Sequence, residues 1–223
     1  MLKEVRASLY AENGKTKLNI LLNVLIVVVV LVLSAEIYFT SNYSGVYVVH
    51  DSMRPTLIGA YSDDVIGGDY IYINKNAKPD YGDVVVVNHK TEGCLIKRAV
   101  AFGGDSVRLV EGCLQIKKKG TTKFESVSEP YVFPDNNDGT LPKNTYPHDR
   151  EGNLVEEGYI VPEGHFFLLG DNRNVSKDSR ELGSFPLSSL DGVVTDWSLK
   201  HKSFCTALHS YFKFKLPSYF GLR

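Results

Sequence analysis

The chain has few cysteines, and none of them has the spacing of a metal site. There are three in 223 residues, with no CxxC pair and no cysteine–histidine cluster at zinc spacing. The formal net charge is −1, which gives no argument for nucleic acid as a partner. Repeats and low-complexity tracts are absent, and the apolar content is ordinary for a folded chain. The sequence therefore predicts a folded domain with neither a zinc site nor a nucleic-acid partner.

The cysteines leave the redox compartment open. Cys94 and Cys113 flank a predicted hairpin and can pair in an oxidising compartment. Three cysteines do not fix a connectivity. In the alternative, these two and Cys205 are small buried apolar side chains.

A long apolar run occurs once. Residues 18–39 are mostly apolar, with an unbroken run at 24–33, and no second stretch of comparable length follows. At about 1.5 Å per residue, a helix of this length spans a hydrocarbon core of roughly 30 Å and satisfies its own backbone in lipid. We therefore expect a single transmembrane helix at 18–39.

The charges beside this segment predict its orientation. Four basic residues precede it: Lys3, Arg6, Lys15 and Lys17. Residues 40–49 contain no lysine or arginine. The positive-inside rule then keeps residues 1–17 in the cytoplasm and exports residues 40–223. The alternative is a cleaved signal peptide, but a cut after Ala35 would put the large side chain of Leu33 at the −3 position.

The exported part is predicted to be mainly β. Eight short β-branched or aromatic runs are separated by glycine, aspartate, asparagine and proline, and no helical periodicity longer than two turns stands out after residue 40. Such a pattern favours antiparallel sheets in a barrel or a sandwich. Residues 117–163 are rich in proline, asparagine and aspartate, which predicts a β-rich or irregular insert. Residues 201–223 are basic and aromatic, and either lie on an anionic membrane surface or pack on the domain.

A candidate nucleophile lies where the first predicted strand ends. Ser52 follows the run VYVVH and precedes Met53-Arg54-Pro55. Proline fixes its own φ and disfavours helix at Arg54, so we expect the serine on a sharp bend that opens to a cleft. A solvated turn serine is the alternative.

A candidate base lies in the apolar run LIKRAVAF. By the alternation of a strand, Lys97 shares a face with Leu95 and Ala99. On a buried face its pKa falls from about 10.4 toward the ~7–8 of a general base, and a neutral lysine can take a serine proton. If Arg98 faces inward instead, Lys97 is solvated. A Ser–Lys pair beside an anchor indicates proteolysis at a membrane surface.

A dense polar turn follows the predicted strand HFFLLG. It reads LGDNRNVSKDSR over residues 169–180. Aspartate and arginine there can pair and hold a loop, and Ser176 can bond a catalytic amine. A solvated turn is the alternative.

Together these segments resemble the type I signal peptidases, the Ser–Lys proteases that remove signal peptides from exported preproteins. DSMRPTL is similar to the nucleophile box of that family, GDYIYINK and KRAVAFGGD to its strand and lysine boxes, and GDNRNVSKDSR to its last box. The resemblance covers about residues 15 to 198, in order. One departure is Phe102-Gly103-Gly104, where a Pro-Gly turn is common in the family, and we expect the turn to form.

The resemblance implies a role for each candidate. Ser52 is the nucleophile, and its backbone N–H contributes to the oxyanion hole. Lys97 is the general base, and Ser176 hydrogen-bonds and orients it. His50 stands where members carry a second hydroxyl donor or a glycine, so the second donor stays open. Five residues of the last box support the site through ion pairs and turn shape: Asp171, Asn172, Arg173, Asp178 and Arg180.

The resemblance also implies an acyl-enzyme mechanism without a metal or cofactor. The substrates are extended, with small residues at −1 and −3, and the implied partners are signal peptides, membrane lipid and the export translocon. A lysine base favours the bacterial and organellar branch over the endoplasmic reticulum branch, which uses histidine. We expect a bacterial cytoplasmic membrane, with the domain on the outer face.

Three other functions share some of these sequence features. A LexA-like self-cleaving peptidase would need a DNA-binding region or an internal cleavage site, and the N-terminus is an anchor instead. A conjugation-linked maturation peptidase shares the fold and the dyad and differs only in substrate. A non-catalytic tethered domain that binds exported peptides would be expected to have lost Ser52 or Lys97, and both are present.

Overall fold

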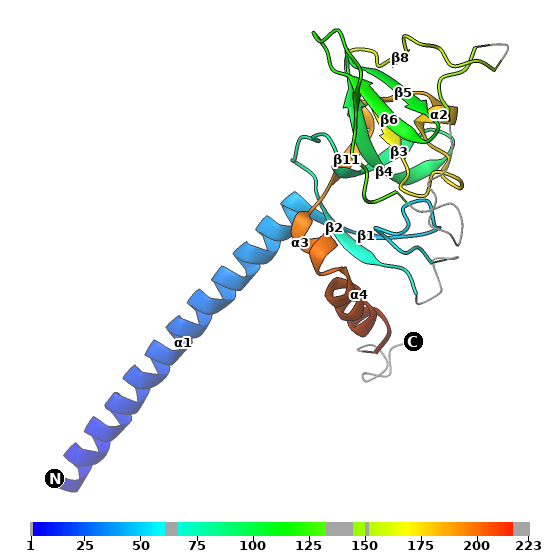
Figure 1. The fold of residues 1–223 in the computed structure, drawn as a ribbon. Helices are drawn as coiled ribbons and strands as arrows, with labels where there is room; N and C mark the ends of the chain where they lie inside the picture. The colour runs from blue at the N-terminus through cyan, green and yellow to red at the C-terminus, as the bar shows by residue number, and fades with distance from the viewer. Residues whose placement is uncertain (1, 61–66, 133–144, 150–151, 216–223) are drawn as a thin grey trace. The chain divides into compact units, whose positions relative to one another are not determined.

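The computed structural model describes residues 2–60, 67–132, 145–149 and 152–215. Parts of the predicted insert and of the basic tail, at 133–144, 150–151 and 216–223, lie outside the described residues. The chain divides into a helical unit, residues 1–43, and a β-rich unit, residues 44–223 (Figure 1).

The helical unit is one long helix, α1 (Leu2–Asn42). Its part from Thr16 to Asn42 is 27 residues long, has a mean hydropathy of 2.9 and buries none of its side chains in the protein. The two hydroxyls near its end bond back to the carbonyls of the preceding turn, Ser34 to Val30 and Thr40 to Glu36. The helix is therefore long and apolar enough to cross a membrane, and it extends past the predicted span at both ends.

A seven-stranded sheet forms the centre of the β-rich unit. In spatial order its strands are β1 (Tyr43–Tyr47), β2 (Tyr70–Asn74), β11 (Leu190–Val194), β3 (Val84–His89), β4 (Gly93–Phe102), β9 (His165–Leu169) and β10 (Phe185–Pro186). The pairs from β2 to β10 are antiparallel. In the β3–β4 pair, Val85 lies opposite Lys97. The β-branched run of β3 favours this extended, packed conformation.

A smaller sheet packs on the central one. Its order is β7 (Glu125–Ser126), β6 (Cys113–Lys117), β5 (Ser106–Val110) and β8 (Tyr159–Ile160). The β5–β6 hairpin turns at Glu111 and Gly112, both at positive φ, as a two-residue hairpin loop requires. The predicted insert contributes β7 and β8 to this sheet.

Three apolar clusters bury both faces of the central strands. Val84 and Val86 of β3 pack in one cluster, and Val85 and Val87 pack in another. β4 is divided in the same way, because Val100 packs against the smaller sheet while Ala99 faces the other side. The core therefore continues on both sides of β3 and β4, unlike the one-sided burial that simple alternation assumes.

The structure confirms the predicted fold class, an apolar N-terminal helix followed by an antiparallel β domain. It also contains short helices that the pattern did not predict: α2 (Ser179–Leu182), a 3₁₀ turn (Leu187–Ser189), α3 (Asp196–Lys200), α4 (Lys202–Ser210) and a π turn (Tyr211–Lys215). With nine residues, α4 is too short for a clear period, and its packing on β2 fixes it. All three cysteines are free, and only Cys205 is buried.

Candidate active site

Ser52 lies on a bend that the core holds from both sides. Met53 and Leu57 are fully buried in one apolar cluster, and the Leu57 N–H bonds to the Met53 carbonyl at 2.9 Å. The Ser52 carbonyl accepts the Asn172 N–H at 3.0 Å, which ties the bend to the polar turn after β9. The Ser52 N–H donates no hydrogen bond within the described residues. The predicted bend is present, with one backbone donor left beside the hydroxyl.

Lys97 brings its amine to this hydroxyl. Its Nζ lies 3.0 Å from Ser52 Oγ and 3.0 Å from the Ile96 carbonyl, and the residue is 2% exposed. Burial lowers the pKa of Lys97 to about 8, although the carboxylates of Asp178 and Asp171 act in the opposite direction. A substantial fraction of this amine is therefore neutral near pH 8, so it can act as a base.

The LIKRAVAF strand buries both cations, so the alternative in which Lys97 is solvated is wrong although Arg98 does face inward. Lys97 is buried on one face of β4, and Arg98, 8% exposed, is buried on the other. Both faces of the strand are buried, so each of the two cations must be either neutral or paired with an anion. Lys97 meets burial with a lowered pKa, whereas Arg98 stays charged and finds a carboxylate.

That carboxylate belongs to Asp171. Arg98 donates from Nε and Nη2 to the two Asp171 oxygens at 2.8 and 2.6 Å, and Nη1 donates to the Gly82 carbonyl at 2.7 Å. Thr56 Oγ1 also donates to Asp171, and the Tyr131 ring lies 3.8 Å from the guanidinium carbon. This fork joins β4, the last box and the segment from Ser52 to Leu57, which we call the nucleophile loop.

A second buried pair closes the polar turn. Arg180 Nε and Nη2 donate to the two oxygens of Asp178 at 2.8 and 2.9 Å. Asp178 also accepts the Gly170 N–H at 3.0 Å and caps α2 by accepting the Arg180 N–H. Arg180 donates in addition to the Arg173 carbonyl at 2.7 Å. The turn is thus held by an ion pair and hydrogen bonds, and the predicted alternative of a solvated turn is wrong.

Glu129 is a partner that sequence reasoning missed. Its carboxylate pairs with Arg173, and both side chains are nearly inaccessible. Tyr131 donates to the same carboxylate at 2.9 Å, and Arg173 Nε donates to the Gly170 carbonyl at 3.0 Å. The predicted insert therefore supplies residues that hold Arg173 in place. The available signal was the requirement that a buried arginine find a carboxylate.

Ser176 departs from expectation. It is 5% exposed, yet its Oγ makes no hydrogen bond within the described residues, so the expected bond to Lys97 is absent. A Cβ on Gly170 would lie 2.1 Å from this Oγ and 2.6 Å from the Ser52 carbonyl oxygen. The hydroxyl therefore packs on the Gly170 backbone beside the nucleophile loop, while Lys97 bonds to Ser52 and Ile96.

Among the residues that the structure describes, His50 lines the same cleft as the dyad but makes no hydrogen bond to it. Its backbone has φ +65°, its side chain is exposed, and no hydrogen bond to the ring occurs within the described residues. Glycine adopts such a left-handed backbone without strain, whereas a histidine does so at a cost.

A cleft of about 610 Å³ opens at the dyad. One wall is the end of β1 with the residues after it, at 46–50, and the other is residues 94–97 of β4. β9 pairs with β4 only from Arg98 onward, so β4 has an edge beside the cleft that β9 does not cover. An ion pair between Glu92 and Lys177, 2.8 Å long, lies at the rim. The shape suits an extended peptide.

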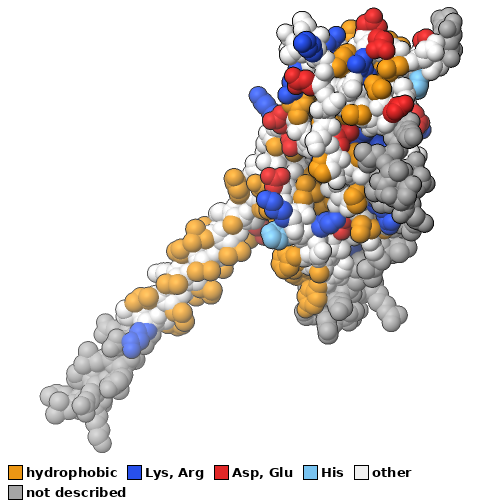
Figure 2. Space-filling model, in the orientation of Figure 1, with side chains coloured by type: hydrophobic (Ala, Val, Ile, Leu, Met, Phe, Trp, Pro, Cys, Tyr) orange, Lys and Arg blue, Asp and Glu red, His pale blue; other side chains and the backbone are white. Residues whose placement is uncertain are grey.

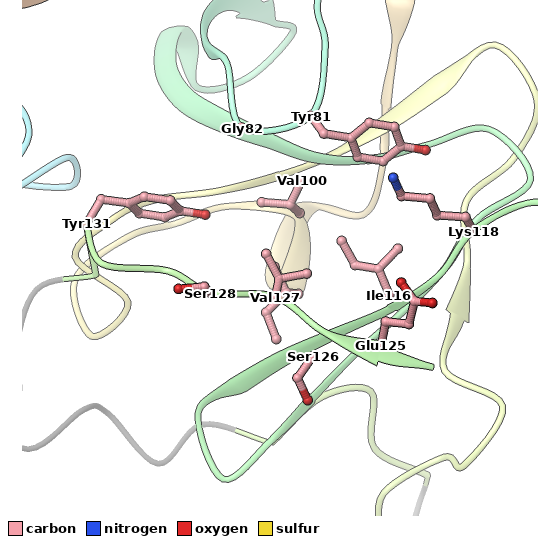
Figure 3. A pocket seen from close by; sticks show the side chains of 11 residues that line it. Tyr81, Gly82, Val100, Ile116, Lys118, Glu125, Ser126, Val127, Ser128 and Tyr131 are labelled. Carbon is pink, nitrogen blue, oxygen red and sulfur yellow. The ribbon is translucent and has the colours of Figure 1, made fainter. Parts of the chain in front are cut away.

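A second cavity, of about 350 Å³, lies between the sheets (Figure 3). Tyr81 and Tyr131 stand on opposite sides of it, over a floor that includes Val100 and Ile116. It contains neither member of the dyad. Within the part of the chain that the structure describes, no group of three His, Cys, Asp or Glu side chains has the arrangement of a metal site.

A serine hydroxyl bonded to a buried, partly neutral lysine at the end of a peptide-sized cleft is the arrangement of a Ser–Lys hydrolase. Comparison with known proteins then identifies the family. Residues 19–197 match the family described as signal peptidase, peptidase S26, and the chain belongs to it. Membership makes the chain a serine peptidase that removes signal peptides from preproteins.

Individual relatives agree with this assignment. Signal peptidase I of Streptococcus pneumoniae serotype 4 is 30% identical over 185 residues, which cover 71% of this chain and 81% of that protein. Signal peptidase I of Pseudomonas aeruginosa PAO1 is 30% identical over 186 residues, 69% of this chain and 60% of that protein. The crystal structure of a signal peptidase I from Enterococcus faecalis V583 is 29% identical and covers 53% of this chain and 98% of that one, with a TM-score of 0.41.

Proposed function

We propose that the chain is a membrane-anchored endopeptidase that cleaves signal peptides from exported preproteins, with Ser52 as nucleophile and Lys97 as general base. The observation that carries this assignment is the 3.0 Å contact between Lys97 Nζ and Ser52 Oγ, made by an amine whose pKa is lowered to about 8. A serine in a solvated turn would lack this contact, and a fully charged lysine could not accept the serine proton.

The reaction is acyl transfer in two steps. Neutral Lys97 takes the Ser52 proton as Oγ attacks the carbonyl carbon of the residue before the cut. The Ser52 N–H faces the developing oxyanion. Lys97 then gives its proton to the leaving amine, and an ester on Ser52 remains. Lys97 next takes a proton from water, which attacks the ester and releases the signal peptide with a new carboxylate, while the proton returns to Ser52.

The support residues fix this geometry. The fork of Arg98 on Asp171 holds the last box against β4, and the Asn172 N–H holds the Ser52 carbonyl. Asp178 and Arg180 lock the turn that carries Ser176. We assign Ser176 as a positioning residue, because its buried hydroxyl has no hydrogen-bond partner within the described residues and packs on Gly170, beside the Ser52 carbonyl.

The cleft suggests how the substrate lies. An extended peptide can add to the β4 edge at residues 94–97 through backbone hydrogen bonds, with alternate side chains turned toward the wall at 46–50. Apolar lining residues such as Val48, Met53 and Ile96 leave shallow space, which favours small side chains at −1 and −3. An extended substrate with small residues at these two positions matches the C-terminal end of a signal peptide.

The apolar helix supports an anchored enzyme that acts at a bilayer. The apolar part of α1 has the length of a membrane span, and the basic residues before it favour a cytoplasmic N-terminus. In this arrangement residues 40–223 act on the outer face, where exported preproteins emerge, with the export translocon as a neighbour.

The test is cleavage of a preprotein with an Ala-X-Ala site by the full chain in lipid. Wild type should release the mature protein with its N-terminus after the second alanine. Ser52→Ala and Lys97→Met, which keeps the volume of lysine without its amine, should each lose more than about a thousandfold in kcat/KM. Matched variants at exposed positions, Ser188→Ala and Lys90→Met, should stay within about twofold.

The outcomes also separate the nearest alternative. If several such preproteins stay intact while a serine-directed acylating inhibitor still labels Ser52, the dyad is active and the substrate is specialised, as in a conjugation-linked maturation peptidase. If the folded wild type neither cleaves nor is labelled, the peptidase assignment fails and a peptide-binding role replaces it.

A further inference from the structure

The C-terminal helix α4 is fixed to the β-rich unit by one face. Cys205 is 3% exposed, and Thr206 Oγ1 accepts the Tyr70 N–H of β2 at 2.8 Å. The His209 ring stacks on Tyr70, with the ring centres 3.8 Å apart. At the start of the helix Lys202 donates to the Thr56 carbonyl at 2.6 Å. The helix therefore has a defined orientation on the domain.

The other face of α4 exposes large apolar side chains. Two of them, Phe204 and Leu208, continue into Tyr211 and Phe212 of the π turn that follows. These four side chains, exposed by 66%, 41%, 44% and 56%, form what we call the C-terminal stripe. Figure 2 shows hydrophobic side chains gathered at this end of the β-rich unit. Exposed aromatic and aliphatic side chains in one stripe indicate a surface that meets another apolar phase.

The C-terminal segment of the sequence differs in the sign of its charge from the rest of the unit. Residues 197–223 contain four lysines and one arginine with no aspartate or glutamate, a net charge of +5. Residues 44–196 contain sixteen basic and twenty-three acidic residues, a net charge of −7. Lys200 and Lys213 are exposed near the stripe. An apolar helical face flanked by lysines and free of acids matches an anionic bilayer surface.

We propose that α4 and the turn after it form an interfacial membrane-binding surface, in which the C-terminal stripe enters the boundary between headgroups and acyl chains and the lysines bind anionic lipid headgroups. This surface lies beyond residue 197, where the match to the family ends. It is a second membrane contact, separate from α1, and its lipid binding does not depend on the peptidase chemistry.

The position of the stripe relative to the cleft gives the contact a consequence. Tyr47 of β1 lines the cleft, and its ring centre lies 6.3 Å from that of His209 and 5.9 Å from Lys213 Nζ. The segment that would bind a bilayer therefore contacts one residue of the cleft wall. This consequence rests on the proposed function, because it would present the cleft to a substrate that is still held in the membrane.

The single tryptophan of the chain makes a direct test possible. In a Trp197→Phe background, Phe204→Trp places the only indole on the stripe, and Ile160→Trp places it at a matched exposure, 64%, on β8. β8 and α4 lie at opposite ends of the β-rich unit (Figure 1). The full chain is reconstituted into phosphatidylcholine bilayers with and without phosphatidylglycerol, with acyl chains brominated so that they quench nearby indoles. Circular dichroism checks that each variant is folded.

Brominated lipid should quench the Phe204→Trp emission by more than about half in bilayers with phosphatidylglycerol and leave the Ile160→Trp emission unchanged. Replacing Lys200 and Lys213 by glutamine should remove the dependence on phosphatidylglycerol. The same replacement at two exposed lysines elsewhere, Lys90 and Lys123, should not.

Equal quenching at the two positions would overturn the proposal. So would an emission from Phe204→Trp that is shielded both from brominated lipid and from aqueous iodide, because a protein surface, such as a second copy, would then cover the stripe. Quenching that ignores both phosphatidylglycerol and the lysines would refute the assignment of anionic headgroups. None of these results depends on whether the chain cleaves preproteins.

Discussion

The pH dependence of cleavage tests the lysine base most closely. Burial lowers the pKa of Lys97 from 10.5 to about 8, a change in differential stabilisation of about 3 kcal/mol between the charged and neutral amine. With that pKa, about one tenth of the amine is neutral at pH 7 and about nine tenths at pH 9. We therefore expect kcat/KM to rise about tenfold between these values, along a single acid limb with its midpoint near pH 8.

The same shift affects stability, so the assay needs a folding control. The folded pKa of Lys97 lies below the unfolded one, so between about pH 8 and 10.5 the unfolded chain binds more protons. The contribution of Lys97 to the free energy of unfolding thus rises with pH over that window, and its full penalty is present below pH 8. Far-ultraviolet circular dichroism and denaturant titration at each pH separate a loss of base from a loss of fold.

The assay follows an internally quenched Ala-X-Ala peptide with the full chain in lipid, from pH 6 to 10. Lys97→Arg supplies a matched variant that keeps the positive charge and is not deprotonated in this range, so its activity should stay at the level of Lys97→Met throughout. A flat profile, or a limb near the ordinary lysine pKa while the protein stays folded, would refute the reasoning that burial prepares this amine.

Three further substitutions probe the support of the site. Asp171→Asn leaves the Arg98 guanidinium buried without its carboxylate, so it should lower the free energy of unfolding by about 3–5 kcal/mol in a urea titration. The control Glu163→Gln, which removes an exposed ion pair, should lower it by less than about 1 kcal/mol. Gly170→Ala puts a Cβ 2.6 Å from the Ser52 carbonyl oxygen and should cost at least tenfold in kcat, while Gly67→Ala, with open space around it, should change nothing. Ser176→Ala should lower kcat with little change in unfolding free energy, because its hydroxyl makes no hydrogen bond to lose; unchanged kcat with lower stability would give it a packing role instead.

Local patterns were sufficient for the main elements and for the bend at Ser52. The apolar run predicts α1, the β-branched runs predict the central strands, and the proline after Arg54 predicts the bend at Ser52. The alternation of LIKRAVAF was not sufficient to place Lys97, because it assumes that a strand has one buried face. β4 has two, since the smaller sheet and the apolar cluster around Val85 cover opposite sides.

The partners of the charged residues could not be predicted from local sequence. Arg98 and Asp171 are 73 positions apart, and Glu129 and Arg173 are 44 apart, so only the pairing of β4 with β9 and the path of residues 125–132 bring them together. The close approach of Gly59 to the His50 carbonyl, which leaves no room for a Cβ, is likewise a contact between segments that local sequence does not show. Register and close packing decide such features, and a single sequence does not display them.

The most direct test of the central claim is the site and rate of acylation by a serine-directed probe, mapped by mass spectrometry on the full chain in lipid. We predict one modified residue, Ser52, a rate that follows the neutral fraction of Lys97 from pH 7 to 9, and no modification in Lys97→Met within the time that labels wild type completely. Labelling of another serine, or labelling of Ser52 at the wild-type rate in Lys97→Met, would contradict the assignment of Lys97 as the base that activates Ser52.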